Sequence, residues 1–112
     1  MANQIPVSQA NEMIQQYLNY MTSLGVDMNN QTRAITFPTG EVLKFMNENM
    51  QYTDEYRICL GVYPSGDSRA GKMSVIVWPY KNGQPAMKPD DPGKGTGGGK
   101  TIAPFNDGGL IP

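Results

Sequence analysis

The chain of 112 residues contains no histidine and a single cysteine, Cys59. The absence of histidine excludes every catalytic dyad or triad that uses an imidazole base. One cysteine cannot form an intrachain disulfide, and without histidine the chain lacks the ligand set of a zinc site. We therefore expect no catalytic residue, no metal site and no cofactor, and we expect Cys59 to be a small buried side chain in a strand.

Net charge is nearly absent as well, because nine basic residues face ten acidic ones. A formal charge of −1 gives no bulk attraction to nucleic acid or to an anionic membrane, and the lysines diluted along residues 81–100 add little. No apolar run approaches the length that spans a bilayer, and residues 1–6 lack the basic and apolar regions of a signal peptide. We expect a cytoplasmic protein that has neither nucleic acid nor membrane as a partner.

Apolar residues are scarce, at 38%, whereas the chain has 13 glycines and nine prolines. This composition predicts a folded part followed by a long irregular part. We expect a single domain in residues 1–80, a Gly/Pro-rich linker in residues 81–101 and an apolar docking segment in residues 102–112. Within the linker, residues 93–101 fail the spacing of a phosphate-binding loop, because Lys94 stands where a glycine is required.

The docking segment has an electrostatic reason to lie on the rest of the protein. Residues 1–56 hold six acids against two bases, and residues 57–112 hold seven bases against four acids. We expect the basic tail to lie against an acidic helix face, either of its own domain or of a neighbouring subunit.

The strongest structural signal is a hairpin formed by residues 56–63 and 72–80. Both runs are rich in β-branched and aromatic residues, and turn-forming residues separate them. Joining the alternating apolar positions into one face pairs Ile58 with Val77, Leu60 with Val75 and Val62 with Met73. The second face then pairs Arg57 with Trp78, Cys59 with Ile76 and Gly61 with Ser74.

Two helices are expected before the hairpin. Ser8 could cap the first, which ends near Gly25, and its apolar face consists of Ala10, Met13, Ile14, Tyr17, Leu18, Met21 and Leu24. Its other face carries few charges, so it is either solvated or covered by the tail or another subunit. Thr39 could cap the second helix, and residues 33–37 suit a short edge strand. We expect both helices to pack on the Ile58–Val75 face of the hairpin.

The candidate site lies on the opposite face, where Arg57 and Trp78 are cross-strand neighbours flanked by Tyr63 and Tyr80. These residue types are enriched in interaction hot spots, although the same face could simply pack against another element. The alternative is a ligand site in which Arg57 holds an anionic group, with Tyr63 or Asp67 as polar partners. A deep pocket at Arg57 would favour ligand binding, and a flat aromatic face would favour interaction.

The hairpin resembles a family of small uncharacterised bacterial proteins with a strand of the form Arg-Ile-Tyr-Phe-Gly-x-Tyr and a second apolar strand ending in Val-Pro. Arg57, Ile58, Gly61 and Tyr63 match this pattern, whereas Cys59 and Leu60 replace its aromatics and Trp78 stands before Pro79. Residues 106–110 and Pro112 are similar to the family's ending, which continues to a cysteine that this chain lacks. The resemblance supports the hairpin and implies no established activity.

Together these features predict an α+β fold with two amino-terminal helices on a small antiparallel sheet and an extended carboxy-terminal tail. We expect a non-enzymatic interaction or structural module that self-associates as a homo-oligomer or binds a protein partner.

Overall fold

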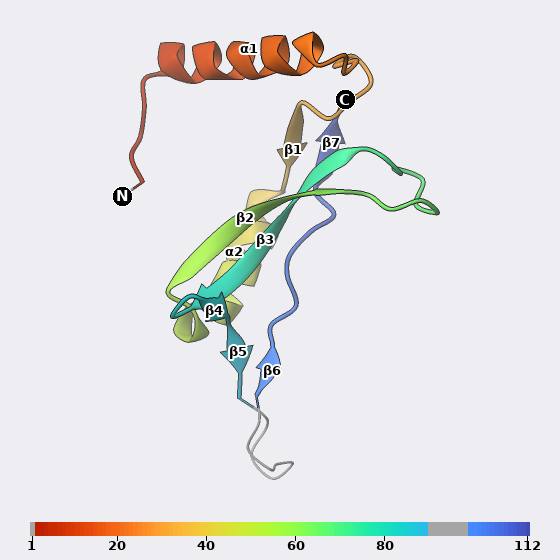
Figure 1. Cartoon of the computed structure of the whole chain (residues 1–112). Coiled ribbons are helices and arrows are strands. Elements are labelled where there is room, and N and C mark those ends of the chain that lie inside the picture. Colours follow the sequence, from red (N-terminus) through yellow and green to blue (C-terminus); the bar gives the residue numbers. More distant parts are fainter. Residues whose placement is uncertain (1, 90–98) are drawn as a thin grey trace.

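The computed structural model describes residues 2–89 and 99–112, whose elements are drawn in Figure 1. Two helices, α1 (Val7–Ser23) and α2 (Thr39–Asn49), precede a long hairpin of β2 (Glu55–Val62) and β3 (Met73–Lys81). A 3-10 turn, Met50–Tyr52, joins α2 to β2. The other strands are short: β1 (Ala34–Thr36), β4 (Gln84–Pro85), β5 (Met87–Lys88), β6 (Lys100–Thr101) and β7 (Gly109–Ile111). All pairings are antiparallel, which confirms the predicted α+β class.

The hairpin has the predicted register along its whole length. Ile58 lies opposite Val77, and Arg57 lies opposite Trp78. The connecting loop reverses the chain through an Asx turn in which Asp67 Oδ1 accepts a hydrogen bond from the Arg69 amide at 2.7 Å. The register is set because a one-residue slip would divide the apolar side chains between two faces.

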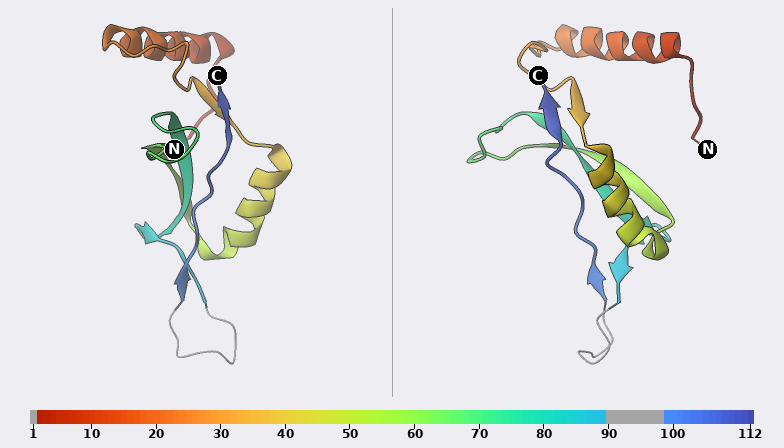
Figure 2. Two further views of the ribbon diagram at one scale, coloured as in Figure 1. Left: turned by 90° about the vertical axis from the view of Figure 1, so that its right-hand side faces the viewer. Right: turned by 180° about the vertical axis from the view of Figure 1, so that it is seen from behind.

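The carboxy-terminal tail crosses the hairpin and returns to β1 (Figure 2). Phe105 and Val77 exchange backbone hydrogen bonds of 2.8 and 2.9 Å, and β7 then pairs with β1 from Ala34–Ile111 to Thr36–Gly109. Gly108 permits this pairing, since a Cβ there would lie 2.5 Å from a methyl carbon of Ile35. Residues 102–112 therefore lie on their own chain.

Part of the segment predicted as a linker forms short strands. Residues 87–88 pair with residues 100–101, and the Ile102 amide donates to the Ala86 carbonyl at 3.0 Å. Periodicity cannot reveal strands of two residues, which explains why the sequence gives no sign of them. Asp90, Asp91 and the glycine-rich run at 93–98 lie outside the described residues, so the linker assignment there stays a prediction.

A small aromatic core forms between α2, the hairpin and the tail. The Phe45 ring stacks on Phe105 with centroids 4.9 Å apart, and the centroid of the Phe37 ring lies 5.1 Å from that of Phe105. Tyr56 contacts Phe45 and donates its hydroxyl to the Met46 carbonyl at 3.1 Å. The second helix thus packs on the predicted face of the hairpin, at the Tyr56 end of β2.

The predicted helix caps are wrong by one or two residues. Pro6 and Pro38 occupy the cap positions, and Ser8 and Thr39 lie inside the helices without a capping hydrogen bond. Proline supplies the extended backbone conformation of a cap but no side-chain acceptor. The end of α1 is as predicted, because Gly25 takes a φ of +87° and the Val26 amide donates to Met21 in a Schellman motif.

The first helix does not pack on the sheet, contrary to the prediction. No residue of α1 is buried, and the helix lies apart from the hairpin, linked by a 3.8 Å contact from the Tyr17 hydroxyl to Met73 Sδ. The chain has a radius of gyration of 17.5 Å, whereas a compact chain of this length has one of about 13 Å. Neither helix of the described part has the length and apolar character that a membrane crossing requires.

Candidate functional site

The predicted interaction face is only partly assembled. The Arg57 guanidinium lies over the ring of Tyr80, with Cζ 3.9 Å from the centroid, and Trp78 meets the same ring edge-on at 6.2 Å. Arg57 therefore stacks on Tyr80 instead of on Trp78, although Trp78 is its backbone neighbour. Tyr63 lies at the other end of the hairpin and is buried. The structure brings together three of the four predicted residues.

Arg57 is already engaged by a carboxylate on its own strand. Its Nε and Nη2 atoms donate to Glu55 Oε1 at 3.1 and 3.0 Å. The pair is half exposed and lies two residues apart, on one face of β2. Sequence reasoning did not include Glu55, although the i, i+2 spacing of opposite charges in a strand indicates such a pair. The guanidinium lies over the Tyr80 ring, and the hollows described below are lined by other residues.

A second arginine, which the sequence analysis did not single out, ties the hairpin loop to the tail. Arg69 bonds both carboxylate oxygens of Asp67 at 3.0 and 3.1 Å and donates to the Tyr63 hydroxyl at 3.1 Å. It also forms an ion pair with Asp107 at 3.2 Å. Hydrogen bonds from Arg69 hold the pKa of Asp67 below its usual range, and the same pairing raises the pKa of Arg69.

This ion pair runs opposite to the expected electrostatics of the tail. The tail contributes the acid, Asp107, and the hairpin contributes the base. Net charge of a segment does not determine which individual charges meet, because pairing needs a distance of a few ångströms. Asn106 adds a neutral contact, with its Oδ1 atom 3.3 Å from the Ser74 hydroxyl.

An apolar groove of about 320 Å³ lies on the hairpin face that was predicted to be the core. One wall is the sheet and the opposite wall comes from β1 and α1; its apolar lining is Tyr17, Ile35, Leu60, Val62, Met73 and Val75. Leu60 is 88% exposed, and Ile58 and Val62 are also exposed. The prediction that both helices cover this face is wrong. Helix α2 covers only the Tyr56 end of the face, and α1 has no buried residue.

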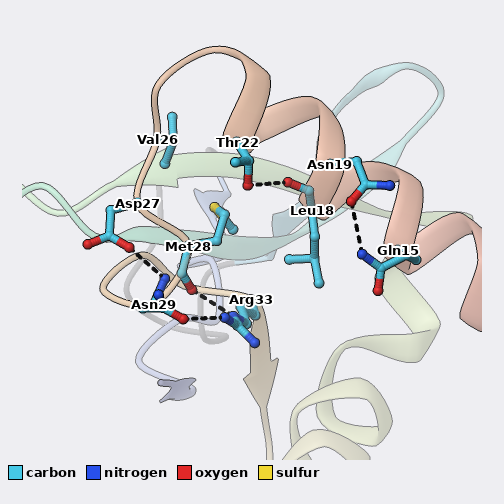
Figure 3. A pocket seen from close by; sticks show the side chains of 9 residues that line it. All are labelled: Gln15, Leu18, Asn19, Thr22, Val26, Asp27, Met28, Asn29 and Arg33. Atoms are coloured by element: carbon cyan, nitrogen blue, oxygen red, sulfur yellow. Dashed lines mark hydrogen bonds between the residues drawn. The ribbon is translucent and has the colours of Figure 1, made fainter.

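Other hollows lie elsewhere on the described residues. The larger, about 380 Å³, is between the end of α1 and the following loop (Figure 3). Its polar groups bond one another: Arg33 donates to the Met28 carbonyl and Asn29 Oδ1, and Gln15 donates to Asn19. A smaller hollow of about 200 Å³ lies beside Tyr63. No group of three His, Cys, Asp or Glu side chains with metal-binding geometry occurs within the described ranges.

The outer edge of β2 is free of pairing in the part of the chain that the structure describes. The sheet order is β2-β3-β4, so β3 is covered on both sides while β2 is covered on one. Figure 1 shows β2 on the side of the hairpin away from the tail. Such an edge is a template for pairing with another strand, and sequence reasoning did not identify it because it considered the faces of the hairpin and not its edges.

Comparison of the chain with protein-family models, with curated proteins and with solved structures finds no match. The resemblance to the small bacterial proteins and the cytoplasmic location therefore stay predictions.

Proposed function

We propose that the protein is a non-enzymatic interaction module that self-associates. The observation that carries the proposal is helix α1, which runs for 17 residues without one buried side chain. Its apolar residues Val7, Met13 and Ile14 are all more than half exposed. An isolated helix of this length is marginal in water, because helical stability in proteins comes mainly from packing an apolar face. A second molecule would supply the missing packing.

The hairpin supports the same proposal from another part of the molecule. Large apolar side chains are exposed on its groove face, whereas the buried apolar residues of the described chain are few: Met28, Tyr63, Val77, Ala86 and Ile102. Contiguous apolar surfaces of this kind mark interaction sites in soluble proteins.

The alternative of an anion-binding site at Arg57 has no observation in its favour. Glu55 already neutralises the guanidinium, and the Tyr80 ring covers one of its faces. An anionic ligand would have to displace a carboxylate that is held on the same strand.

Light scattering at a low and a high protein concentration tests the proposal. We expect a particle mass that is a multiple of the 12.3 kDa chain and that rises with concentration or stays at the multiple. A mass of 12.3 kDa at both concentrations would overturn the proposal.

A further inference from the structure

We propose that two copies of the chain associate through the free edge of β2, antiparallel about a two-fold axis that passes through Cys59. The inference rests on the proposed self-association and names one surface through which two copies meet. It follows from which backbone groups face outward, from the side chains on the edge and from the pairings that each register would create.

The backbone groups of alternate β2 residues point away from β3. The backbone amide of Tyr63 donates to the Lys72 carbonyl at 3.0 Å. The backbone groups of the odd-numbered residues of β2 therefore bond β3. Independently, the N–H and C=O groups of Val77 bond Phe105, on the side of β3 that faces away from β2. Ile58 lies opposite Val77, so its own N–H and C=O groups point away from β3. Both observations place the N–H and C=O groups of the even-numbered residues on the outer edge. These residues are Tyr56, Ile58, Leu60 and Val62.

The edge lacks most of the devices that protect edge strands. Natural edges are blocked by charged side chains, proline, bulges or a covering element. The two charges of β2, Glu55 and Arg57, neutralise each other. Residues 55–62 contain neither proline nor lysine, and their pairing with β3 runs without a bulge. Every outward-bonding residue has an N–H, and Ile58, Leu60 and Val62 are 64%, 88% and 63% exposed. The edge can therefore form an uninterrupted ladder.

The register centred on Cys59 matches every apolar residue of the edge with another. Ile58 lies opposite Leu60 of the second copy, and Tyr56 lies opposite Val62. Each of these is a hydrogen-bonded pair that exchanges two backbone N–H···O bonds, because the backbone groups of both residues point to the outer edge. The apolar side chains then continue across the axis on one face, so the groove surface of each copy adjoins that of the other.

The charged residues fit the same register. Arg57 lies opposite Gly61, which has no side chain to obstruct it and would meet only Ile76 Cδ1, at 3.4 Å, if it had a Cβ. Glu55 lies opposite Tyr63 of the second copy, and its carboxylate is already paired with Arg57 on its own strand. The register therefore places no like charges directly opposite each other.

Neighbouring registers are worse for identifiable reasons. Centring on Ile58 places the Asp54 carboxylate opposite Val62. Centring on Arg57 brings two guanidinium groups together, and like charges directly opposite are destabilising. Centring on Leu60 sets Tyr56 against Pro64, which has no N–H to donate.

The assembly closes at two copies. The other side of the hairpin is already bonded to Phe105 and β4, so each chain contributes one free edge of β2. An isologous contact pairs the β2 edge of one copy with the β2 edge of the other, so no β2 edge is left to add a third copy. The product is a dimer with a continuous sheet across the two-fold axis.

Oxidation of the native chain tests the register directly. In the proposed dimer Cys59 faces Cys59 as a non-hydrogen-bonded pair, with Cα atoms about 4.5 Å apart, within the range that a disulfide accepts. Diamide converts the two thiols to one disulfide and takes up their two hydrogens. We expect rapid formation of a species of twice the chain mass on a non-reducing gel. The matched control is Cys59→Ser combined with Ile76→Cys, which moves the thiol across to β3 on the same face and should remain uncrosslinked.

A substitution on β2 tests the edge without a crosslinking reaction. Leu60→Lys introduces a gatekeeper charge at a side chain that is exposed in the single chain, so it should leave the circular dichroism spectrum unchanged and shift the particle mass from dimer to monomer. Leu43→Lys, at an exposed apolar position on α2, should leave the dimer intact. If the native chain is oligomeric but Cys59 does not crosslink and Leu60→Lys keeps the oligomer, the edge assignment is wrong and the proposed self-association stands. A native chain that is monomeric overturns both.

Discussion

At the scale of single residues, Arg69 is a side chain that joins the hairpin loop to the carboxy-terminal tail. It lies in the hairpin loop, bonds Asp67 and Tyr63 beside it and reaches Asp107 in the tail. These bonds use most of the donors of its guanidinium group, so Arg69 holds the loop and the tail in place and is not free to bind an anion. The link depends on ionised carboxylates and is therefore sensitive to pH.

Replacing Asp67 with asparagine should destabilise the protein at neutral pH and have no effect in strong acid. The pKa of Asp67 is lowered in the folded state, so its stabilising contribution is fully present above the unfolded-state pKa of about 3.9. That contribution is lost as the pH falls through the lower folded-state pKa. Urea unfolding of both proteins at fixed concentration, at pH 7 and in acid, measures the difference. A difference that is the same at both pH values would contradict the assignment; Glu12→Gln, on the exposed helix α1, is the control.

Sequence reasoning at this scale succeeded for backbone neighbours and failed for side-chain partners. The Arg57–Trp78 pairing was predicted because alternation and turn position determine which backbone positions face each other. The stacking of Arg57 on Tyr80 was missed, because a long side chain reaches diagonal neighbours as easily as direct ones. Asp67 and Arg69 are two residues apart in a turn, so their pairing was available from the sequence, whereas the contact to Asp107 needs the path of the tail.

At the scale of elements, the tail is part of the fold. It supplies β7 to β1, bonds β3 at Val77 and adds Phe105 to the aromatic core. The apolar residues of the tail predicted that it docks on the protein, because a solvated tail does not need them. The segments that it contacts were not predicted, because pairings of two or three residues between distant segments have no periodic signature.

Phe105→Ala should lower the free energy of unfolding by about 2–4 kcal/mol, because it removes a ring that packs against both Phe37 and Phe45. The backbone bonds to Val77 do not involve the side chain and are retained. Chemical denaturation at fixed protein concentration provides the measurement. Leu43→Ala, at an exposed position on α2, should stay within about 0.5 kcal/mol of the native chain. Equal losses for the two variants would show that the aromatic cluster is not the core.

At the scale of the whole molecule, the elements were predictable but their burial was not. The hairpin, both helices and the short strand at residues 34–36 follow from periodicity and turn residues. The expectation that apolar side chains such as Leu60 lie in a core assumes that the chain has enough other elements to cover them. This chain does not, since α2 alone is smaller than the hairpin face and no residue of α1 is buried. Sequence patterns identify which face is apolar, and they do not show whether the cover comes from the same chain or from another.

The pairing of β1 with β7 also has a consequence for the order in which the protein folds. The hairpin joins residues that are close in the sequence, but Ala34 pairs with Ile111, which is synthesised much later. Contacts between distant residues form more slowly because a longer loop must be closed. On the ribosome, β1 therefore waits without a partner until Ile111 has emerged, while β2 and β3 can pair early. Pulse-labelled hydrogen exchange during refolding should protect the Tyr63 amide, bonded to Lys72, before the Arg33 amide, bonded to Ile111. The reverse order would show that the pairing of β1 with β7 precedes the hairpin.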